Sequence, residues 1–228
     1  MKTIQLPSGL EAEITHITGK EEELIRQASN QKRPDWLEPA ILACTKSLNG
    51  AQPTYSDIIG LHVGDRLQLL LAIRQESLGD TVPCNFTCEN VECKARNHFE
   101  ININDVENKP LAGFGELTLS DERTAVYGKP TFRYQLELFK SSKKVEDGDI
   151  NKLFLARGIH IGEKAATTEL LNELALRDRE MLFEAVTADP GGPDTKIEIP
   201  CAQCGTVFKG RVEQQLGFLF PKRAALVV

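Results

Sequence analysis

The sequence predicts an α+β fold made of two similar halves, each a helix, a strand and a cysteine knuckle, joined by a split zinc-ribbon-like metal site. Two knuckles support this prediction: a C-x4-C turn at Cys88–Cys93 and a C-x2-C turn at Cys201–Cys204. A constant spacing supports it too, because Asp65 precedes Cys88 by as many residues as Asp178 precedes Cys201. Each half supplies two cysteines, and a tetrahedral structural zinc site needs four ligands, so we expect the halves to meet at one ion.

The regions before the two knuckles match without gaps at a spacing of 113 residues. Apolar and glycine positions coincide in the helices, the turns after them and the strands: Leu69 with Leu182, Ala72 with Ala185, Ile73 with Val186, Gly79 with Gly192, Val82 with Thr195, Cys84 with Ile197, and Phe86 with Ile199. We interpret this pattern as an internal repeat. It predicts an approximate two-fold axis through the metal, with one repeat helix on each side.

The N-terminal half, residues 1–104, is expected to open with a β-hairpin. Strands at 2–6 and 10–17 flank Pro7-Ser8-Gly9, which is typical turn sequence. Thr18 to Glu21 has the form of a capping box and predicts the start of a helix. Pro34 is expected to open a second helix, which carries Cys44 as a small core residue.

The first repeat follows in the same half. Helical spacing of apolar residues predicts a helix over 62–77. Residues 81–87 alternate as a half-buried strand, with Val82, Cys84 and Phe86 on one face. Phe99, Ile101 and Ile103 are expected to form the strand that returns from the knuckle.

A polar, glycine-containing stretch, residues 105–129, is interpreted as a connector to the C-terminal half, residues 130–228. Alternating Phe132, Tyr134, Leu136 and Leu138 predict a strand over 131–140, and a helix is expected to hold Ile150, Leu153, Phe154 and Ala156. The second repeat helix is expected over 168–188, followed by a strand into Cys201, a return over 207–212, and an apolar tail containing Phe218, Leu219 and Phe220.

Bulk properties narrow the function. The chain has 228 residues and 41% hydrophobic residues, enough for a real core. We expect no membrane-spanning segment and no signal peptide, because the required apolar runs are missing. Synthesis in the cytoplasm makes six cysteines better candidates for metal ligands or core thiols than for disulfides. A net charge of −6 argues against a nucleic-acid surface.

Five cysteines compete for four ligand positions. Cys84 matches Ile197, an inward strand residue, whereas Cys88 matches Cys201. We therefore expect Cys88, Cys93, Cys201 and Cys204 to bind the metal, with Cys84 in the core and as the alternative ligand. Structural Zn²⁺ is favoured because the knuckles look closed, and an iron–sulfur cluster is the alternative use of four thiolates.

Catalysis is not expected. The four histidines, His16, His62, His98 and His160, lie in different predicted elements, and the sequence has no phosphate loop and no nucleophile elbow. The recurring Asp65-Arg66 and Asp178-Arg179 pairs are interpreted as anchors that fix each repeat helix to a turn by charge-assisted hydrogen bonds.

Several stretches resemble a known family. They are Leu6-Pro7-Ser8-Gly9-Leu10 followed by Ile17 to Glu22, Gly64-Asp65-Arg66, the run 70–74, the first knuckle with its returning strand, and Cys201-x2-Cys204-Gly205 followed by Phe218 and Phe220. The sequence is similar in these stretches to tail proteins of contractile-tailed phages and related injection particles, which are described as similar to baseplate hub proteins of T-even phages. The C-x4-C form of the first knuckle departs from the family's C-x2-C form.

The resemblance implies a non-enzymatic structural protein of a contractile-tail baseplate, in or near the central hub. Its partners would be hub, tube or wedge subunits, and it would be found in the host cytoplasm during assembly and then in the virion tail baseplate. Two alternatives remain open: a chaperone for hub assembly that leaves the particle, and a zinc-ribbon module that binds nucleic acid or polymerase. Phe218, Leu219 and Phe220 are candidates either for a partner contact or for closing over the chain's own ribbon.

Overall fold

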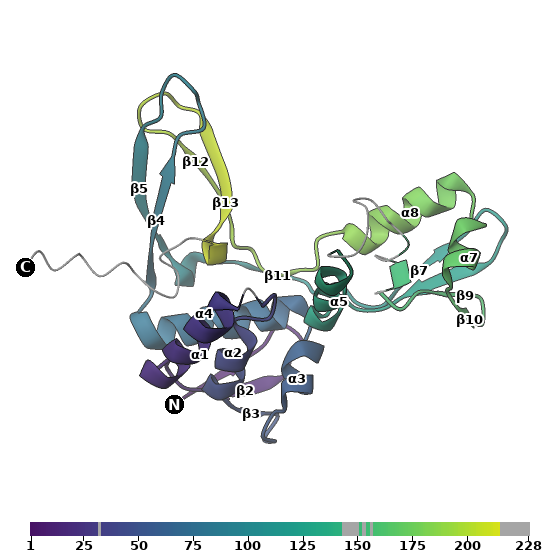
Figure 1. The fold of residues 1–228 in the computed structure, drawn as a ribbon, viewed down its shortest axis with the longest axis horizontal. Helices are drawn as coiled ribbons and strands as arrows, with labels where there is room; N and C mark the ends of the chain where they lie inside the picture. Colours follow the sequence, from purple (N-terminus) through teal and green to yellow (C-terminus); the bar gives the residue numbers. More distant parts are fainter. Residues whose placement is uncertain (32, 143–150, 152–153, 156, 215–228) are drawn as a thin grey trace, which may run out of the picture.

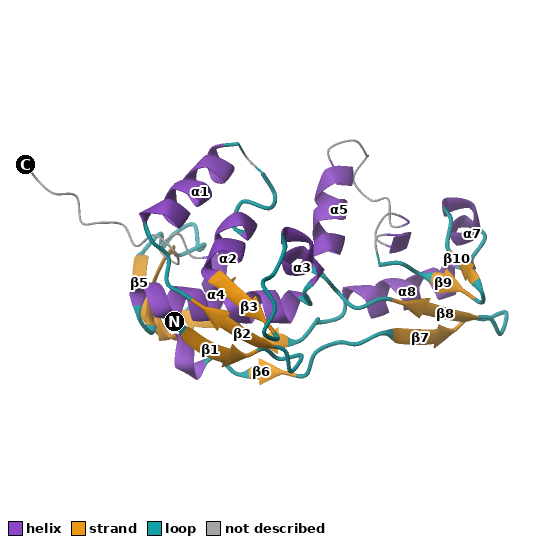
Figure 2. Cartoon of the chain, turned by 90° about the horizontal axis from the view of Figure 1, so that it is seen from below, coloured by secondary structure: helices purple, strands orange, loops and turns teal. Residues whose placement is uncertain are grey.

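A computed structural model describes residues 1–31, 33–142, 151, 154–155 and 157–214 of the chain. It contains three parts (Figure 1). The N-terminal lobe comprises residues 1–79, the second lobe comprises residues 115–188, and the split ribbon consists of two β-hairpins contributed from 81–102 and 196–211. Figure 2, a view from below, shows the two lobes side by side along the long axis of the molecule.

The N-terminal lobe is a three-stranded antiparallel sheet, in the order β1-β2-β3, covered by helices. Its elements are β1 (Lys2–Gln5), β2 (Glu11–Ile14), α1 (Gly19–Asn30), α2 (Glu38–Cys44), β3 (Thr45–Leu48), α3 (Tyr55–Gly60) and α4 (Val63–Leu78). The predicted capping box is confirmed: Thr18 caps α1 and Glu21 bonds back to the cap backbone. The prediction that Pro34 opens the second helix is wrong, because α2 begins at Glu38 with Pro39 in its first turn.

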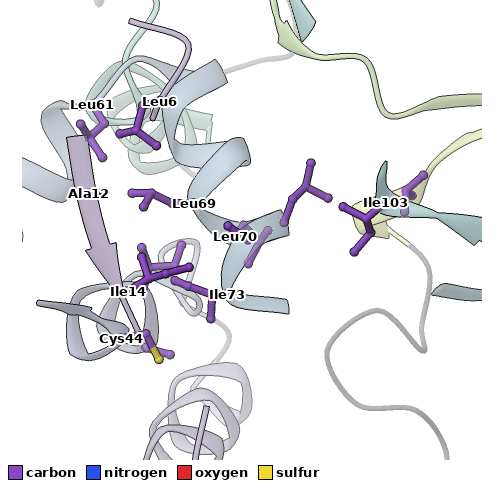
Figure 3. Packing of buried hydrophobic residues seen from close by; sticks show 14 of the residues in the cluster. Leu6, Ala12, Ile14, Cys44, Leu61, Leu69, Leu70, Ile73 and Ile103 are labelled. Atoms are coloured by element: carbon purple, nitrogen blue, oxygen red, sulfur yellow. The ribbon is translucent and has the colours of Figure 1, made fainter. Parts of the chain in front are cut away.

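Helix α4 is the centre of the N-terminal lobe because it is buried on two sides. Leu69 and Ile73 lie on the side of β2, whereas Leu70 lies on the side of Ile103 (Figure 3). Cys44 lies in the same core and is fully buried, as predicted. An α-helix that is apolar on two faces must be covered twice, so α4 packs on the sheet and also carries the ribbon.

The split ribbon rises from the N-terminal lobe (Figure 1). Its hairpins pair β4 (Thr81–Thr87) with β5 (Arg96–Asn102), and β12 (Lys196–Pro200) with β13 (Val207–Arg211). The short 3-10 turns η1 (Ile103–Asp105) and η2 (Val212–Gln214) follow them. The hairpins contact each other through Phe86 and Phe208, whose rings stack at 4.2 Å. Val82, Ile103, Ile197 and Val212 place both hairpin bases in the core of the N-terminal lobe.

The second lobe has its own sheet, in the order β10-β9-β8-β7, and its own core. Its elements are β7 (Gly115–Thr118), β8 (Thr124–Tyr127), α5 (Phe132–Ser142), β9 (His160–Ile161), β10 (Lys164–Ala165), α7 (Thr168–Asn172) and α8 (Leu176–Thr187). The chain enters through β6 (Asn108–Lys109) and returns through β11 (Gly192–Pro193), and these two short strands pair with each other. The second lobe is therefore inserted between the two hairpins of the ribbon.

Element positions in the second lobe follow those of the N-terminal lobe at a spacing of 113 residues. Leu6 and Leu119 each bond to the residue four positions later and accept a bond from the residue three positions later, which closes the same hairpin turn. The further matched pairs share a cap or a buried position: Ala12 with Ala125, Thr54 with Thr167, Ile58 with Leu171, and Leu61 with Leu174.

Three expectations for the second lobe need correction. Residues 132–142 form helix α5 and not a strand; Phe132 and Leu136, four residues apart, are both buried on one side of that helix. The expected single helix over 168–188 is two helices, α7 and α8. The expected connector, residues 105–129, contains β6 and also the hairpin β7–β8 of the second lobe.

The expected two-fold arrangement of the repeat helices about the metal site is also wrong. Helix α4 lies beneath the ribbon, whereas α8 lies in the second lobe, away from it (Figure 1). Residues at matched positions give the reason: α8 has exposed Phe183 and Glu184 where α4 has buried Leu70 and Leu71. Only α4 therefore has a second apolar face on which the hairpin bases can pack.

Candidate metal centre

Four cysteine sulfur atoms come together at the tip of the split ribbon. They belong to Cys88 and Cys93 of the first hairpin and to Cys201 and Cys204 of the second, and they all lie within 4.8 Å of one another. The closest approaches join the hairpins: Sγ of Cys88 is 3.5 Å from Sγ of Cys204, and Sγ of Cys93 is 3.8 Å from Sγ of Cys201. Residues more than a hundred positions apart thus form one cluster.

The first knuckle turns through backbone hydrogen bonds. The N–H of Cys88 donates to the carbonyl of Ala95 at 2.8 Å, and the N–H groups of Cys93 and Lys94 donate to the carbonyl of Asn90. Lys94 has a φ of 48°, so the two extra residues of this knuckle are accommodated before a left-handed position. The C-x4-C spacing therefore still brings both thiols to the same side of the turn.

The second knuckle closes in a similar way with two fewer residues. The N–H of Cys201 donates to the carbonyl of Thr206 at 2.8 Å, and the N–H of Gly205 donates to the carbonyl of Cys201 at 2.8 Å. Gly205 has a φ of 75°, a conformation that glycine adopts without steric cost. Gly205 and Lys94 thus perform the same turn, each directly after the second cysteine of its knuckle.

Hydrogen bonds prepare one thiol for ionisation. Backbone N–H groups of Cys204 and then Gln203, at the turn, lower the pKa of the Cys201 thiol to about 6. A thiolate is the form of cysteine that binds metals. The second knuckle therefore offers a sulfur that is largely ionised at neutral pH.

The two remaining cysteines lie elsewhere. Cys84 is fully buried in the core below the ribbon, and burial raises the pKa of its thiol to about 11. Burial likewise raises the pKa of Cys44, in the N-terminal lobe, to about 11. Both therefore have the properties of inert core thiols. The structure thus separates Cys84 from the predicted ligand set, while metal binding itself stays a prediction.

The donor set fits one tetrahedral ion. Zinc–sulfur bonds of about 2.3 Å in tetrahedral geometry place ligand sulfurs about 3.8 Å apart. The sulfur pairs at 3.5 and 3.8 Å agree with that separation. A cluster of several iron ions would need its thiolates farther apart, because they bind to different ions.

Sequence reasoning did not single out Asn97, which contacts this site. It lies on β5 of the first hairpin and forms hydrogen bonds to Cys201 and Ala202 of the second knuckle. No local pattern could have identified it, because the contact spans 104 positions. His98, the histidine next to the first knuckle, is exposed and bonds to Asn85 instead.

The remaining predicted positions are accounted for as follows. The aspartates of both Asp-Arg pairs anchor a turn, as predicted: Asp65 accepts the N–H of Ser8 and Asp178 accepts the N–H of Ser120. Phe218, Leu219 and Phe220 lie outside the described residues. Within the part of the chain that is described, no helix combines the length and apolar character required to cross a bilayer.

The main cleft lies beside the N-terminal lobe and has a volume of about 1030 Å³. Its titratable lining groups include Asp65, which binds the turn at Ser8, and Arg133, which binds Ser56. His62 lines it too, and its Nε2 is 2.9 Å from the carbonyl of Ala112. These side chains hold neighbouring segments together, which is a structural use.

Comparison with known proteins identifies a family. A family model described as "T4 bacteriophage base plate protein" matches residues 1–205. The match covers both lobes and reaches the residue after the last cysteine. Searches of curated proteins and of solved structures returned no significant match.

Proposed function

Because the chain belongs to the T4 bacteriophage base plate protein family, we propose that it is a structural subunit of a contractile-tail baseplate, in or near the central hub. The family match over residues 1–205 carries this proposal. The resemblance of both chain ends to hub-type tail proteins supports the hub position. Hub, tube or wedge subunits are the proposed partners, in the host cytoplasm during assembly and then in the virion tail. No catalytic role is proposed.

A structural Zn²⁺ held by Cys88, Cys93, Cys201 and Cys204 is the second part of the proposal. The sulfur separations and the all-cysteine donor set support zinc over an iron–sulfur cluster. The ion would join hairpins that lie on either side of the inserted second lobe. Metal binding would then supply folding free energy and fix the two crossing segments of the chain.

An internal duplication is the third part. The spacing of 113 residues recurs in the hairpin turns, the helix caps and the Asp anchors, which supports descent from one ancestral unit. The first copy kept the second apolar face of its main helix and carries both hairpins. The second copy is a lobe with its own core, available for contacts with other subunits.

Purified particles test the baseplate proposal against its first alternative. Mass spectrometry of intact tails or baseplates should find the protein at a fixed ratio to the tube and sheath subunits. A hub-assembly chaperone would be present in infected cells and absent from particles. Deletion of residues 216–228 tests the tail: a folded, metal-loaded chain that fails to enter particles would support a partner contact there, and an insoluble chain would support closure over the ribbon.

The second alternative, a zinc-ribbon module that binds nucleic acid or polymerase, is tested by a gel-shift titration with duplex and single-stranded DNA. The net charge of −6 predicts no complex at moderate salt. A complex that persists at that salt would favour the nucleic-acid alternative over the baseplate proposal.

A further inference from the structure

We propose that Asn97 is a positioning residue for the metal centre, which binds the second knuckle to the first hairpin and orients Cys201 toward the ion. The inference rests on the metal site of the proposed function. It concerns a residue outside the four cysteines, and it assigns to the amide side chain the task of joining two segments that the fold brings together from either side of the second lobe.

Three contacts use the whole amide group of Asn97. Its Oδ1 accepts the backbone N–H of Ala202 at 3.0 Å. Its Nδ2 donates to Sγ of Cys201 at 3.5 Å and to the carbonyl of Ala95 at 3.2 Å. The amide can satisfy all three partners in one orientation only, because a flip would turn the NH2 group toward the N–H and the oxygen toward a carbonyl and a sulfur.

The position of Asn97 in its hairpin makes the contact possible. Asn97 comes two residues after Ala95, whose carbonyl closes the first knuckle. Phe208 comes two residues after Thr206, whose carbonyl closes the second knuckle. Phe208 stacks on Phe86 of the first hairpin, while Asn97 reaches Cys201 and Ala202 of the second. Each hairpin therefore uses this position to contact the other one.

The two reciprocal contacts differ in what they specify. Stacked rings bury apolar area but tolerate sliding, whereas a side-chain amide with three fixed partners sets direction and register. An N–H donor aimed at a metal-binding sulfur also stabilises the thiolate and fixes the direction of its lone pairs. Asn97 is thus suited to hold Cys201 in a ligating geometry before the ion arrives.

Zinc affinity and a cobalt spectrum test the proposal on the full chain. The variants are Asn97→Ala and the isosteric Asn97→Asp, which keeps an acceptor for Ala202 but places a carboxylate beside Sγ of Cys201. Asn85→Ala is the control, because Asn85 is an exposed asparagine on β4 that bonds to His98. Affinity is measured by competition with a chromophoric chelator, and Co²⁺ substitution reports the ligand field and the sulfur-to-metal charge-transfer band.

We expect both Asn97 variants to bind one Zn²⁺ with about 10- to 100-fold lower affinity, and their cobalt charge-transfer band to shift, while the Asn85→Ala chain behaves as wild type. Wild-type affinity and spectrum in the Asn97 variants would overturn the positioning role, also if their metal-free stability fell, because a merely structural contact predicts that result. A wild-type chain that binds no metal would overturn the metal site itself and the inference with it.

Discussion

Asp65 and Asp178, which lie 113 positions apart, hold equivalent hairpin turns. Oδ1 of Asp65 accepts the N–H of Ser8 at 2.8 Å, and Oδ1 of Asp178 accepts the N–H of Ser120 at 2.9 Å. Both carboxylates are buried near the first turn of a helix, α4 in one lobe and α8 in the other. Each lobe thus fixes its sheet to its main helix through the same contact.

Removal of either carboxylate should therefore destabilise its own lobe by a similar amount. Asp65→Ala and Asp178→Ala should each lower the free energy of unfolding by about 1–3 kcal/mol, the usual loss of a charge-assisted hydrogen bond. Asp121→Ala is the matched control, because Asp121 forms an exposed pair with Arg123, and it should cost less than about 1 kcal/mol. Urea denaturation measures all three. A large loss for Asp65 together with none for Asp178 would contradict equivalent anchors.

Close backbone packing makes Gly64 sensitive to a single methyl group. A Cβ at Gly64 would lie 2.5 Å from Cδ2 of Leu111, 2.8 Å from the carbonyl oxygen of Gly191 and 3.0 Å from Cα of Gly192. Gly64→Ala should thus separate α4 from β11 and destabilise the chain by about 1–3 kcal/mol. Gly19→Ala, at the open first position of α1, should be neutral or slightly stabilising. Equal melting temperatures for the two variants would contradict this packing.

The inserted second lobe should be removable. Lys109 pairs with Gly192 where the chain leaves and returns, so an Asn-Gly turn can replace residues 110–191. Both hairpins share the core of the N-terminal lobe, so the shortened chain should fold as a monomer and bind one Zn²⁺, with lower stability because Leu61 loses its cover from the second half. Circular dichroism and metal analysis check this. The shortened chain carrying Cys201→Ser is the control, and failure of the unsubstituted short chain to bind metal would refute the expectation.

His62 should give the fold an acid-sensitive contact between its two halves. Its Nδ1 accepts the N–H of Gly64 at 3.0 Å, and burial lowers its pKa below the ordinary 6.5. Asp65, Lys129 and Arg157 are the charged groups around it. The unfolded chain binds the proton at higher pH than the folded chain does, so stability should fall as pH drops below about 6.5 and level off below the folded pKa.

The variant His62→Gln isolates this contribution. The stability difference between wild type and His62→Gln should shrink between pH 7.5 and 5, as measured by denaturant titration at each pH. His16→Gln, at an exposed histidine, should leave a difference that does not change over the same range. A constant difference for His62→Gln would mean that its protonation is not coupled to folding.

Local patterns allowed much of this fold to be predicted from the sequence. The opening hairpin, the capping box at Thr18, both knuckles and the two aspartate anchors each depend on residues close together or on one repeated spacing. Contacts between distant segments could not be predicted. Helix α5 alternates like a strand, but Phe132 packs under Arg66 of the other lobe, whose guanidinium lies 4.1 Å from the ring centroid. Tertiary packing therefore decided its structure.

The position of the ribbon was missed for a related reason. The matched residues Leu71 and Glu184 differ in polarity, but this difference acquires meaning only when α4 is seen to be covered on both faces. The contact of Asn97 with Cys201 was missed because it requires the two hairpins to be already side by side.

The most direct test of the account is the metal content of the purified chain, measured by native mass spectrometry and elemental analysis. One Zn²⁺ per chain is expected, retained by Cys84→Ala and lost or greatly weakened in Cys88→Ser and Cys201→Ser, because metal-binding free energy is folding free energy at such sites. Two ions per chain, or metal lost from the Cys84 variant and kept by the Cys88 variant, would contradict a single centre shared by the two hairpins.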